Sequence, residues 1–211
     1  MKDFKKLKVL IFLATLSAGV LVISNIVAAK LWNLAGISVD GGLLIFPLSY
    51  VLGDLMVELY GKKIANYVIY VGLCLNIVAV VVFGLVGLLP AYAGWSGQAA
   101  YEEILGFVPR IVAGSLVAYL LSGVLNNWVF EKIRQKTGEK KLWLRFLGSS
   151  AVAKLVDSLI FEIVAFLGVL SFGEFLAQAT FAYLVGLVLE TVLVPVSYFC
   201  VRRLRKYGIQ D

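Results

Sequence analysis

Two carboxylates lie within a strongly hydrophobic stretch, Phe46 to Lys63, whose sequence is FPLSYVLGDLMVELYGKK. Asp54 and Glu58 are four residues apart, so a helix places them on one face, one turn from each other. A carboxylate in hydrocarbon costs at least about 2.5–3.5 kcal/mol, and such residues therefore face a protein interior or a water-filled cavity. Carboxylates accept hydrogen bonds from the N–H groups of a ligand, and they can also bind a proton. The stretch is therefore a candidate functional site.

The composition of the chain is typical of a membrane protein. Of the 211 residues, 61% are hydrophobic and 15% are charged, and the mean hydropathy is +0.95. A soluble domain of this length has too little interior to bury so much apolar surface. The alternation expected of barrel strands is absent, and each apolar segment is near or above the roughly 20 residues that cross a bilayer as a helix. The sequence predicts one all-α domain over residues 1–211, with six transmembrane helices at Val9–Ala29, Leu43–Tyr60, Tyr67–Leu89, Ile104–Phe130, Phe146–Leu170 and Leu176–Val201.

The distribution of basic residues predicts the orientation in the membrane. With the N-terminus inside, sixteen of the nineteen Lys and Arg residues fall on the cytoplasmic side. None falls in the opposite loops around Asn33–Gly42, Pro90–Glu103 and Ser171–Phe175. By the positive-inside rule, both termini are cytoplasmic. The net charge of +6 is then a signal of topology, and we expect no binding of nucleic acid. The opposite loops carry acidic residues, namely Asp40, Glu102, Glu103 and Glu174.

Several polar residues of the predicted helices fall at a similar depth. At a rise of 1.5 Å per residue, Asp54 lies about 12 Å from the cytoplasmic boundary and Asp157 about 18 Å. Polar side chains from four helices thus lie near the bilayer midplane, where the substrate site of a transporter is expected. The members of this predicted belt are Asp54, Asn76, Lys154, Asp157 and Glu190.

Some of these charged residues have simpler interpretations. Lys154 and Asp157 are three residues apart and can form an ion pair that only neutralises both. Glu58 is close to two lysines and is interfacial on that interpretation. Arg110, near the outer end of its helix, is either interfacial or a gate or anion partner. Asp54 is hardest to explain without a function, because neither boundary of the membrane is within its reach.

The sequence argues against an enzyme. It contains no histidine, which removes the commonest metal ligand and the commonest general base. It contains neither a Walker-type motif for ATP nor a protease signature such as H-E-x-x-H, and we expect no cofactor and no metal. Two alternatives were weighed: an intramembrane aspartyl enzyme that uses Asp54 and Asp157, and a structural membrane subunit that binds no small molecule.

The block FPLSYVLGDLMVELYGKKIANYVIYVG resembles the signature of the queuosine precursor transporter family, also called the putative vitamin uptake transporter family. That family carries a similar F-P-x-x-Y-x-x-x-D-x-x-x-E-x-Y-G-K block in its second helix. The block SSAVAKLVDSLIFEIVAFLG resembles a second family block, with Lys154 at a position where glutamine is expected. Asn25 in the first helix and Arg110 in the fourth also resemble family positions. The resemblance extends in order over nearly the whole chain.

The resemblance implies an inner-membrane uptake transporter for 7-deazaguanine bases, such as 7-cyano-7-deazaguanine and 7-aminomethyl-7-deazaguanine, which feed tRNA modification. A carboxylate can accept both N–H groups of a guanine-like edge, and aromatic rings can stack on the heterocycle. The O6 acceptor can be addressed by the amide of Asn25, Asn76 or Gln178. We predict Asp54 and Asp157 at the substrate, with Glu58 as a gate or proton site. The predicted substrate-binding residues are Asn25, Phe46, Tyr50, Asp54, Glu58, Asn76, Arg110, Lys154, Asp157 and Phe161.

The source of energy stays open at this point. The chain can act alone, as a facilitator or a proton-coupled carrier. Alternatively it is the substrate-binding subunit of an energy-coupling-factor vitamin importer, whose fold also has six helices and whose partner docks on an Ala-x-x-x-Ala face such as Ala14 and Ala18. The expected partners are a nucleobase substrate and the lipid bilayer, while a homo-oligomer and an ATPase energising module are left open.

Overall fold

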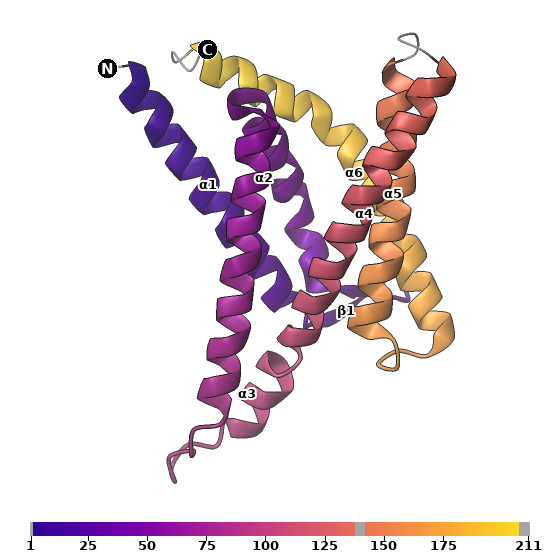
Figure 1. Cartoon of the computed structure of the whole chain (residues 1–211). Coiled ribbons are helices and arrows are strands. Elements are labelled where there is room, and N and C mark those ends of the chain that lie inside the picture. Colours follow the sequence, from indigo (N-terminus) through magenta and orange to yellow (C-terminus); the bar gives the residue numbers. More distant parts are fainter. Residues whose placement is uncertain (1, 138–141, 207–211) are drawn as a thin grey trace. The chain divides into compact units, whose positions relative to one another are not determined.

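The computed structural model describes residues 2–137 and 142–206, and most of them are helical (Figure 1). The chain divides into two compact units. Unit 1 comprises Met1–Leu31, Asp40–Pro109 and Val188–Asp211, and unit 2 comprises Trp32–Val39 and Arg110–Leu187. The elements are α1 (Lys2–Val27), β1 (Leu31–Leu34), β2 (Ile37–Asp40), the 3-10 turn η1 (Gly41–Leu44), α2 (Phe46–Gly87), α3 (Gln98–Leu105), α4 (Val108–Thr137), α5 (Leu142–Phe166) and α6 (Phe172–Lys206).

Four stretches of the described chain are long and apolar enough to cross a membrane. They confirm the prediction of a mostly helical, multi-pass membrane protein. The number of six spans stays a prediction, because the second and third predicted segments together form α2, and α5 is not among the four stretches. The stretches are Phe4–Val27, Leu55–Gly87, Gln98–Asn126 and Phe172–Leu204.

The long helix α2 consists of two limbs that meet at Gly61. This residue has φ 81° and ψ 161°, outside the helical region. A positive φ is readily adopted by glycine and strained for a residue with a Cβ atom. In Figure 1 the two limbs lie side by side, and the chain reverses its direction between them. The limbs therefore correspond to the second and third segments that the sequence predicts, with Gly61 at their boundary.

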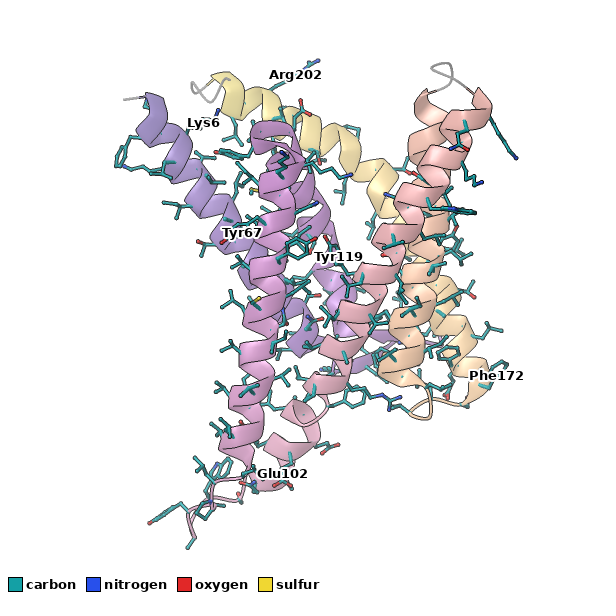
Figure 2. The ribbon with its side chains drawn as sticks, in the orientation of Figure 1. Lys6, Tyr67, Glu102, Tyr119, Phe172 and Arg202 are labelled. Carbon is teal, nitrogen blue, oxygen red and sulfur yellow. The ribbon has the colours of Figure 1, made fainter. Side chains whose placement is uncertain are left out.

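The core of unit 1 is formed by apolar side chains of α1, both limbs of α2 and the last part of α6. Tyr60, beside the turn of α2, donates a hydrogen bond from its hydroxyl to the carbonyl of Lys6, 2.9 Å away. Figure 2 shows Lys6 and Arg202 at one end of the unit and Glu102 at the other. These two basic residues and this acidic residue thus lie at opposite ends of the unit. The core side chains are Leu13, Val20, Leu52, Leu55, Met56, Leu59, Ala65, Val68 and Val201.

The helices α1 and α2 approach closely at Gly72. A Cβ atom on this glycine would lie 2.9 Å from Cδ2 of Leu21 and 3.6 Å from Cα of Ala18. Ala18 is buried, with 6% of its surface exposed. The small-residue face of α1 is therefore used, at Ala18, for packing within unit 1, as small residues allow two helix backbones to come close together.

A short β-hairpin, β1 and β2, follows α1 where the sequence predicts only a loop. Its turn residues Ala35 and Gly36 have φ of 52° and 90°. Positive φ at both central residues is the mark of the hairpin turn that matches strand twist. The N–H of Gly36 also donates to Oδ1 of Asn33, at 2.9 Å. The predicted outer loops missed this hairpin and the eight-residue helix α3, because such short elements carry too few residues to show a periodic pattern.

Candidate functional site

Two buried amides join α1 to the second limb of α2. Nδ2 of Asn25 donates to Oδ1 of Asn76 at 2.8 Å, and Nδ2 of Asn76 donates to the carbonyl of Gly72 at 2.9 Å. Asn25 is 4% exposed and Asn76 is 1% exposed. Burying an amide is costly unless it is hydrogen-bonded, so this pair holds the two helices in one register. The structure thus brings together two predicted site residues that are 51 positions apart.

Asp40 caps η1 close to the end of α1. Its Oδ1 accepts a hydrogen bond from the N–H of Gly42 at 2.8 Å. A Cβ atom on Gly42 would lie 2.7 Å from that oxygen and 3.2 Å from Oγ of Ser24, so the glycine lets these groups approach. Burial raises the pKa of Asp40 to about 6, although hydrogen bonds from backbone N–H groups act in the opposite direction. Unit 1 therefore holds a buried carboxyl in the loop between α1 and α2, to which the sequence assigns no role.

In unit 2, Asp157 of α5 lies between a hydroxyl and an ammonium group. Oγ of Ser122, on α4, donates to Oδ1 of Asp157 at 3.0 Å. Lys154, one helical turn earlier, interacts electrostatically with the same carboxylate. The arrangement is one acceptor group flanked by a neutral donor and a positive charge. It can bind a ligand that presents both N–H donors and a carbonyl acceptor.

A second buried polar pair links α5 to α6. Nε2 of Gln178 donates to Oε2 of Glu162 at 2.8 Å, and the two residues are 1% and 0% exposed. Oε1 of Gln178 is buried and accepts no hydrogen bond from any residue that the structure describes. Glu162 is not among the site residues that the sequence predicts. A signal was present, since an acid in the middle of an apolar helix is a functional candidate by default.

Arg110 of α4 binds the end of α5, and Phe161 packs against another ring of α5. Nε of Arg110 donates to the carbonyl of Val164 at 2.6 Å, and its Nη2 donates to the carbonyl of Leu167. Carbonyls at a helix C-terminus need partners from outside the helix. Phe161 packs edge-on against Phe166, with 6.0 Å between ring centroids. Both residues thus have structural contacts here, and their predicted contact with a ligand stays a prediction.

The remaining predicted site residues are those of the first limb of α2, together with Glu190 of the predicted belt. The side chains of Phe46, Tyr50 and Asp54 lie outside the described residues, as does that of Glu190. Glu58 is exposed on the first limb of α2. The predicted belt near the bilayer midplane, which joins Asp54 and Asn76 of unit 1 to residues of unit 2, therefore stays a prediction.

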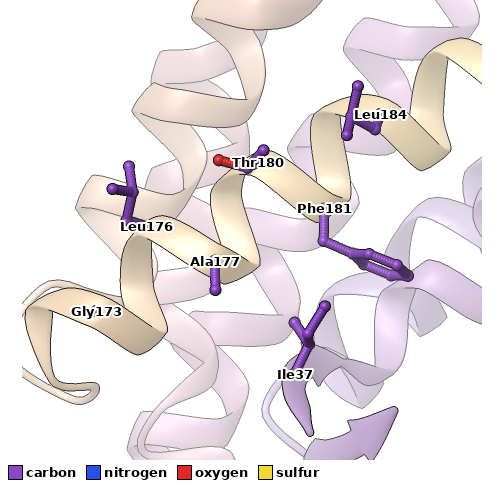
Figure 3. Close-up of a pocket in the computed structure, with 7 residues that line it drawn as sticks. All are labelled: Ile37, Gly173, Leu176, Ala177, Thr180, Phe181 and Leu184. Carbon is purple, nitrogen blue, oxygen red and sulfur yellow. The ribbon is translucent and has the colours of Figure 1, made fainter. Parts of the chain in front are cut away.

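A groove in unit 2 is lined by α6 and by one residue of the hairpin (Figure 3). Its volume is about 450 Å³, and its only polar side-chain group is the hydroxyl of Thr180. None of the predicted site residues lines it. A polar heterocycle needs several hydrogen-bonding partners, so this groove is a poor candidate for the site. The lining residues are Ile37, Gly173, Leu176, Ala177, Thr180, Phe181 and Leu184.

Comparison with known proteins gives matches over most of the chain. Residues 40–200 match the model of a protein family described as putative vitamin uptake transporter. A protein of Bacillus subtilis named probable queuosine precursor transporter is 32% identical over 179 residues, which are 84% of this chain and 78% of that protein. The queuosine precursor transporter of Escherichia coli is 26% identical over 162 residues, 77% of this chain and 71% of that protein. No solved structure matches the chain.

Proposed function

The chain belongs to the putative vitamin uptake transporter family, and we propose that it imports queuosine precursors across the bacterial inner membrane. The proposed substrates are 7-deazaguanine bases, among them 7-cyano-7-deazaguanine and 7-aminomethyl-7-deazaguanine. The observation that carries the proposal is the similarity to two proteins named as queuosine precursor transporters, each over more than 70% of both lengths. The recipient of the imported base is the machinery that modifies tRNA.

The polar residues of unit 2 supply suitable chemistry for such a base. A guanine-like edge presents an N1–H and an exocyclic amine side by side, which one carboxylate accepts through both oxygens. In the proposed complex Asp157 accepts these two donors. The ammonium of Lys154 then donates to the neighbouring O6. Asp157 and Lys154 together thus bind both the N–H donors and the carbonyl acceptor of the base. Ser122 orients the carboxylate through the 3.0 Å hydrogen bond.

Unit 1 holds a second, separate set of candidate residues, Asp54, Phe46 and Tyr50. Aromatic rings of this kind stack on a flat heterocycle, and a carboxylate accepts hydrogen bonds from its N–H groups. Glu58, which is exposed on the first limb of α2, serves as a gate or proton site. The support here is the sequence block alone, since these residues belong to the segment that resembles the family signature.

The proposed topology has six transmembrane helices with both termini in the cytoplasm. The two limbs of α2 give two antiparallel spans, and α5 is a span whose buried acid, Glu162, is shielded from lipid. Within unit 1, Lys6 and Arg202 lie at one end and Glu102 at the other (Figure 2). This separation of charge supports the orientation that the positive-inside rule predicts.

A second candidate function is that of a substrate-binding subunit in an energy-coupling-factor importer. That role needs a face of α1 that stays available for the partner. Ala18 is buried at 6% exposure, and Ala14 packs against the core of unit 1. These contacts favour a carrier that works without an ATPase module. Purification of the chain with an ATPase module bound would favour the second candidate instead.

The test is uptake in cells that lack both their own precursor transport and precursor synthesis. We expect uptake of radiolabelled 7-cyano-7-deazaguanine or its aminomethyl analogue, and little uptake of a pteridine. Asp54→Asn and Asp157→Asn are expected to lower uptake, whereas Glu103→Gln, on the exposed helix α3, is the matched control. If neither deazaguanine enters, the proposed substrate is wrong. If both site variants transport as well as the parent, the proposed site is wrong.

A further inference from the structure

The last turns of α4 carry a groove lined by an aromatic ring and two lysines. It has a volume of about 220 Å³. Three of its residues, Trp128, Lys132 and Lys136, follow one another at intervals of four, so they share one face of the helix. Trp128 is 58% exposed, and Nζ of Lys132 lies 5.6 Å from the centroid of its ring. The remaining lining residues are Val129 and Ile133.

The length of α4 gives the depth of this groove. The helix begins at Val108, and Trp128 comes twenty residues later, which is about 30 Å along the axis. This equals the thickness of the hydrocarbon layer. Lys132 and Lys136 lie about 6 Å and 12 Å further along. When α4 spans the bilayer, the indole is therefore at the boundary of the hydrocarbon, and both ammonium groups are in the headgroup layer.

The chemistry of the groove is complementary to one class of ligand. Tryptophan is enriched at the membrane interface, because its ring is apolar and its N–H is polar. Basic pockets at helix ends on the cytoplasmic side bind anionic headgroups. Ile133 closes the apolar side next to α5, since a Cβ atom on Gly148 would lie 3.0 Å from its Cδ1. The groove thus has a charged part for a phosphate and an apolar part for the start of an acyl chain.

We propose that this groove on α4 is a binding site for an anionic phospholipid. The phosphate lies between the ammonium groups of Lys132 and Lys136, and Trp128 packs beside the glycerol backbone. The site rests on the proposed orientation, in which this end of α4 is cytoplasmic, and is independent of the transported substrate.

The experiment measures quenching of Trp128 fluorescence by brominated lipids in nanodiscs. The three other tryptophans are replaced in the background Trp32→Phe, Trp95→Phe and Trp143→Phe, so that Trp128 alone reports. Brominated phosphatidylglycerol is titrated into phosphatidylcholine discs, and brominated phosphatidylcholine is titrated as the neutral reference. Each lysine near a membrane surface contributes about fivefold in binding, so we expect the anionic lipid to be preferred about 25-fold.

The double variant Lys132→Gln/Lys136→Gln is expected to lose this preference. Lys62→Gln/Lys63→Gln is the matched control, because both of these lysines are exposed beside the turn of α2. Native mass spectrometry of the full chain without tryptophan replacements counts bound phosphatidylglycerol independently. Equal quenching by the two lipids, an unchanged preference in the α4 variant, or displacement of the lipid by millimolar inorganic phosphate would overturn the proposal.

Discussion

Unit 1 and unit 2 both bury polar side chains between apolar helices, but the groups differ in kind. In unit 1 the buried pair between helices is Asn25 and Asn76, two neutral amides whose hydrogen bonds run to each other and to the backbone. In unit 2 each corresponding pair contains a carboxyl: the half-buried Asp157, held by Ser122, and the buried Glu162, held by Gln178. An amide needs only hydrogen bonds to be buried, whereas a carboxylate also loses the hydration of its charge. We therefore predict that the amide pair mainly joins helices, and that Asp157 binds the substrate.

The largest expected effect concerns the carboxyl that is completely buried. Glu162→Leu removes the acceptor of a buried hydrogen bond and leaves the amide N–H of Gln178 without that partner, so we expect a loss of about 1–3 kcal/mol in stability. Denaturant unfolding of the detergent-solubilised protein measures this. Glu162→Gln, which keeps the size and one acceptor, is the control and is expected to lose less. A loss below about 1 kcal/mol for the leucine variant would contradict this prediction, because the buried carboxyl of unit 2 would then matter no more to stability than an ordinary hydrogen bond.

The second prediction concerns the pH dependence of stability that Asp40 causes. This buried acid of unit 1 lies in the loop between α1 and α2, outside the membrane helices. Burial raises the pKa of Asp40 from 3.8 to about 6, so the folded state binds this proton more tightly than the unfolded state. The resulting stability is present below about pH 4 and is lost as the pH rises through 6. The loss from this group is about 3 kcal/mol at most. Melting temperatures between pH 4 and pH 7 should fall in the parent and change less in Asp40→Asn. A parallel fall in both proteins would contradict the assignment.

The third prediction separates transport from folding. Asp157→Asn keeps the acceptor for Ser122 but removes the charge, and a hydrogen bond to a charged group is worth about 1.5–3 kcal/mol. We therefore expect precursor uptake to fall about tenfold or more, with little change in melting temperature. Asn76→Ala should show the opposite: a lower melting temperature and, in the protein that remains folded, nearly normal uptake per molecule. If Asn76→Ala abolishes uptake in folded protein, the amide pair belongs to the substrate site.

The smallest effect is the coupling within the amide pair. A double-mutant cycle with Asn25→Ala and Asn76→Ala measures it, and hydrogen bonds between membrane helices average about 0.6 kcal/mol in such cycles. Thermal or denaturant unfolding of the four proteins gives the coupling energy. A value near zero would mean that each amide acts through its other contacts, such as the carbonyl of Gly72.

Much of the architecture follows from local properties of the chain. The sequence predicts the apolar helical segments and the end of the second one at Tyr60, because hydropathy depends on residues that are close in the chain. The turn of α2 at Gly61 itself comes from the structure. Lys6 and Arg202 lie at one end of unit 1, as the distribution of basic residues along the sequence predicts. The hairpin was missed, since Ala35 gives no turn signal of the Asn-Gly or Asp-Gly kind. The candidate site was predicted only as a set of residue types at similar depths.

Sequence alone therefore determined that this is a helical membrane protein of a transporter family, and which residue types its helices carry. Only the tertiary structure decided their partners. Asn25 meets Asn76 across 51 residues, Ser122 meets Asp157 across 35, and Glu162 meets Gln178 across 16. The physical reason is that such contacts depend on which faces of two helices pack together. Helix packing is fixed by close approaches such as those at Gly72 and Gly114, where the absence of a Cβ atom lets the neighbouring helix come near.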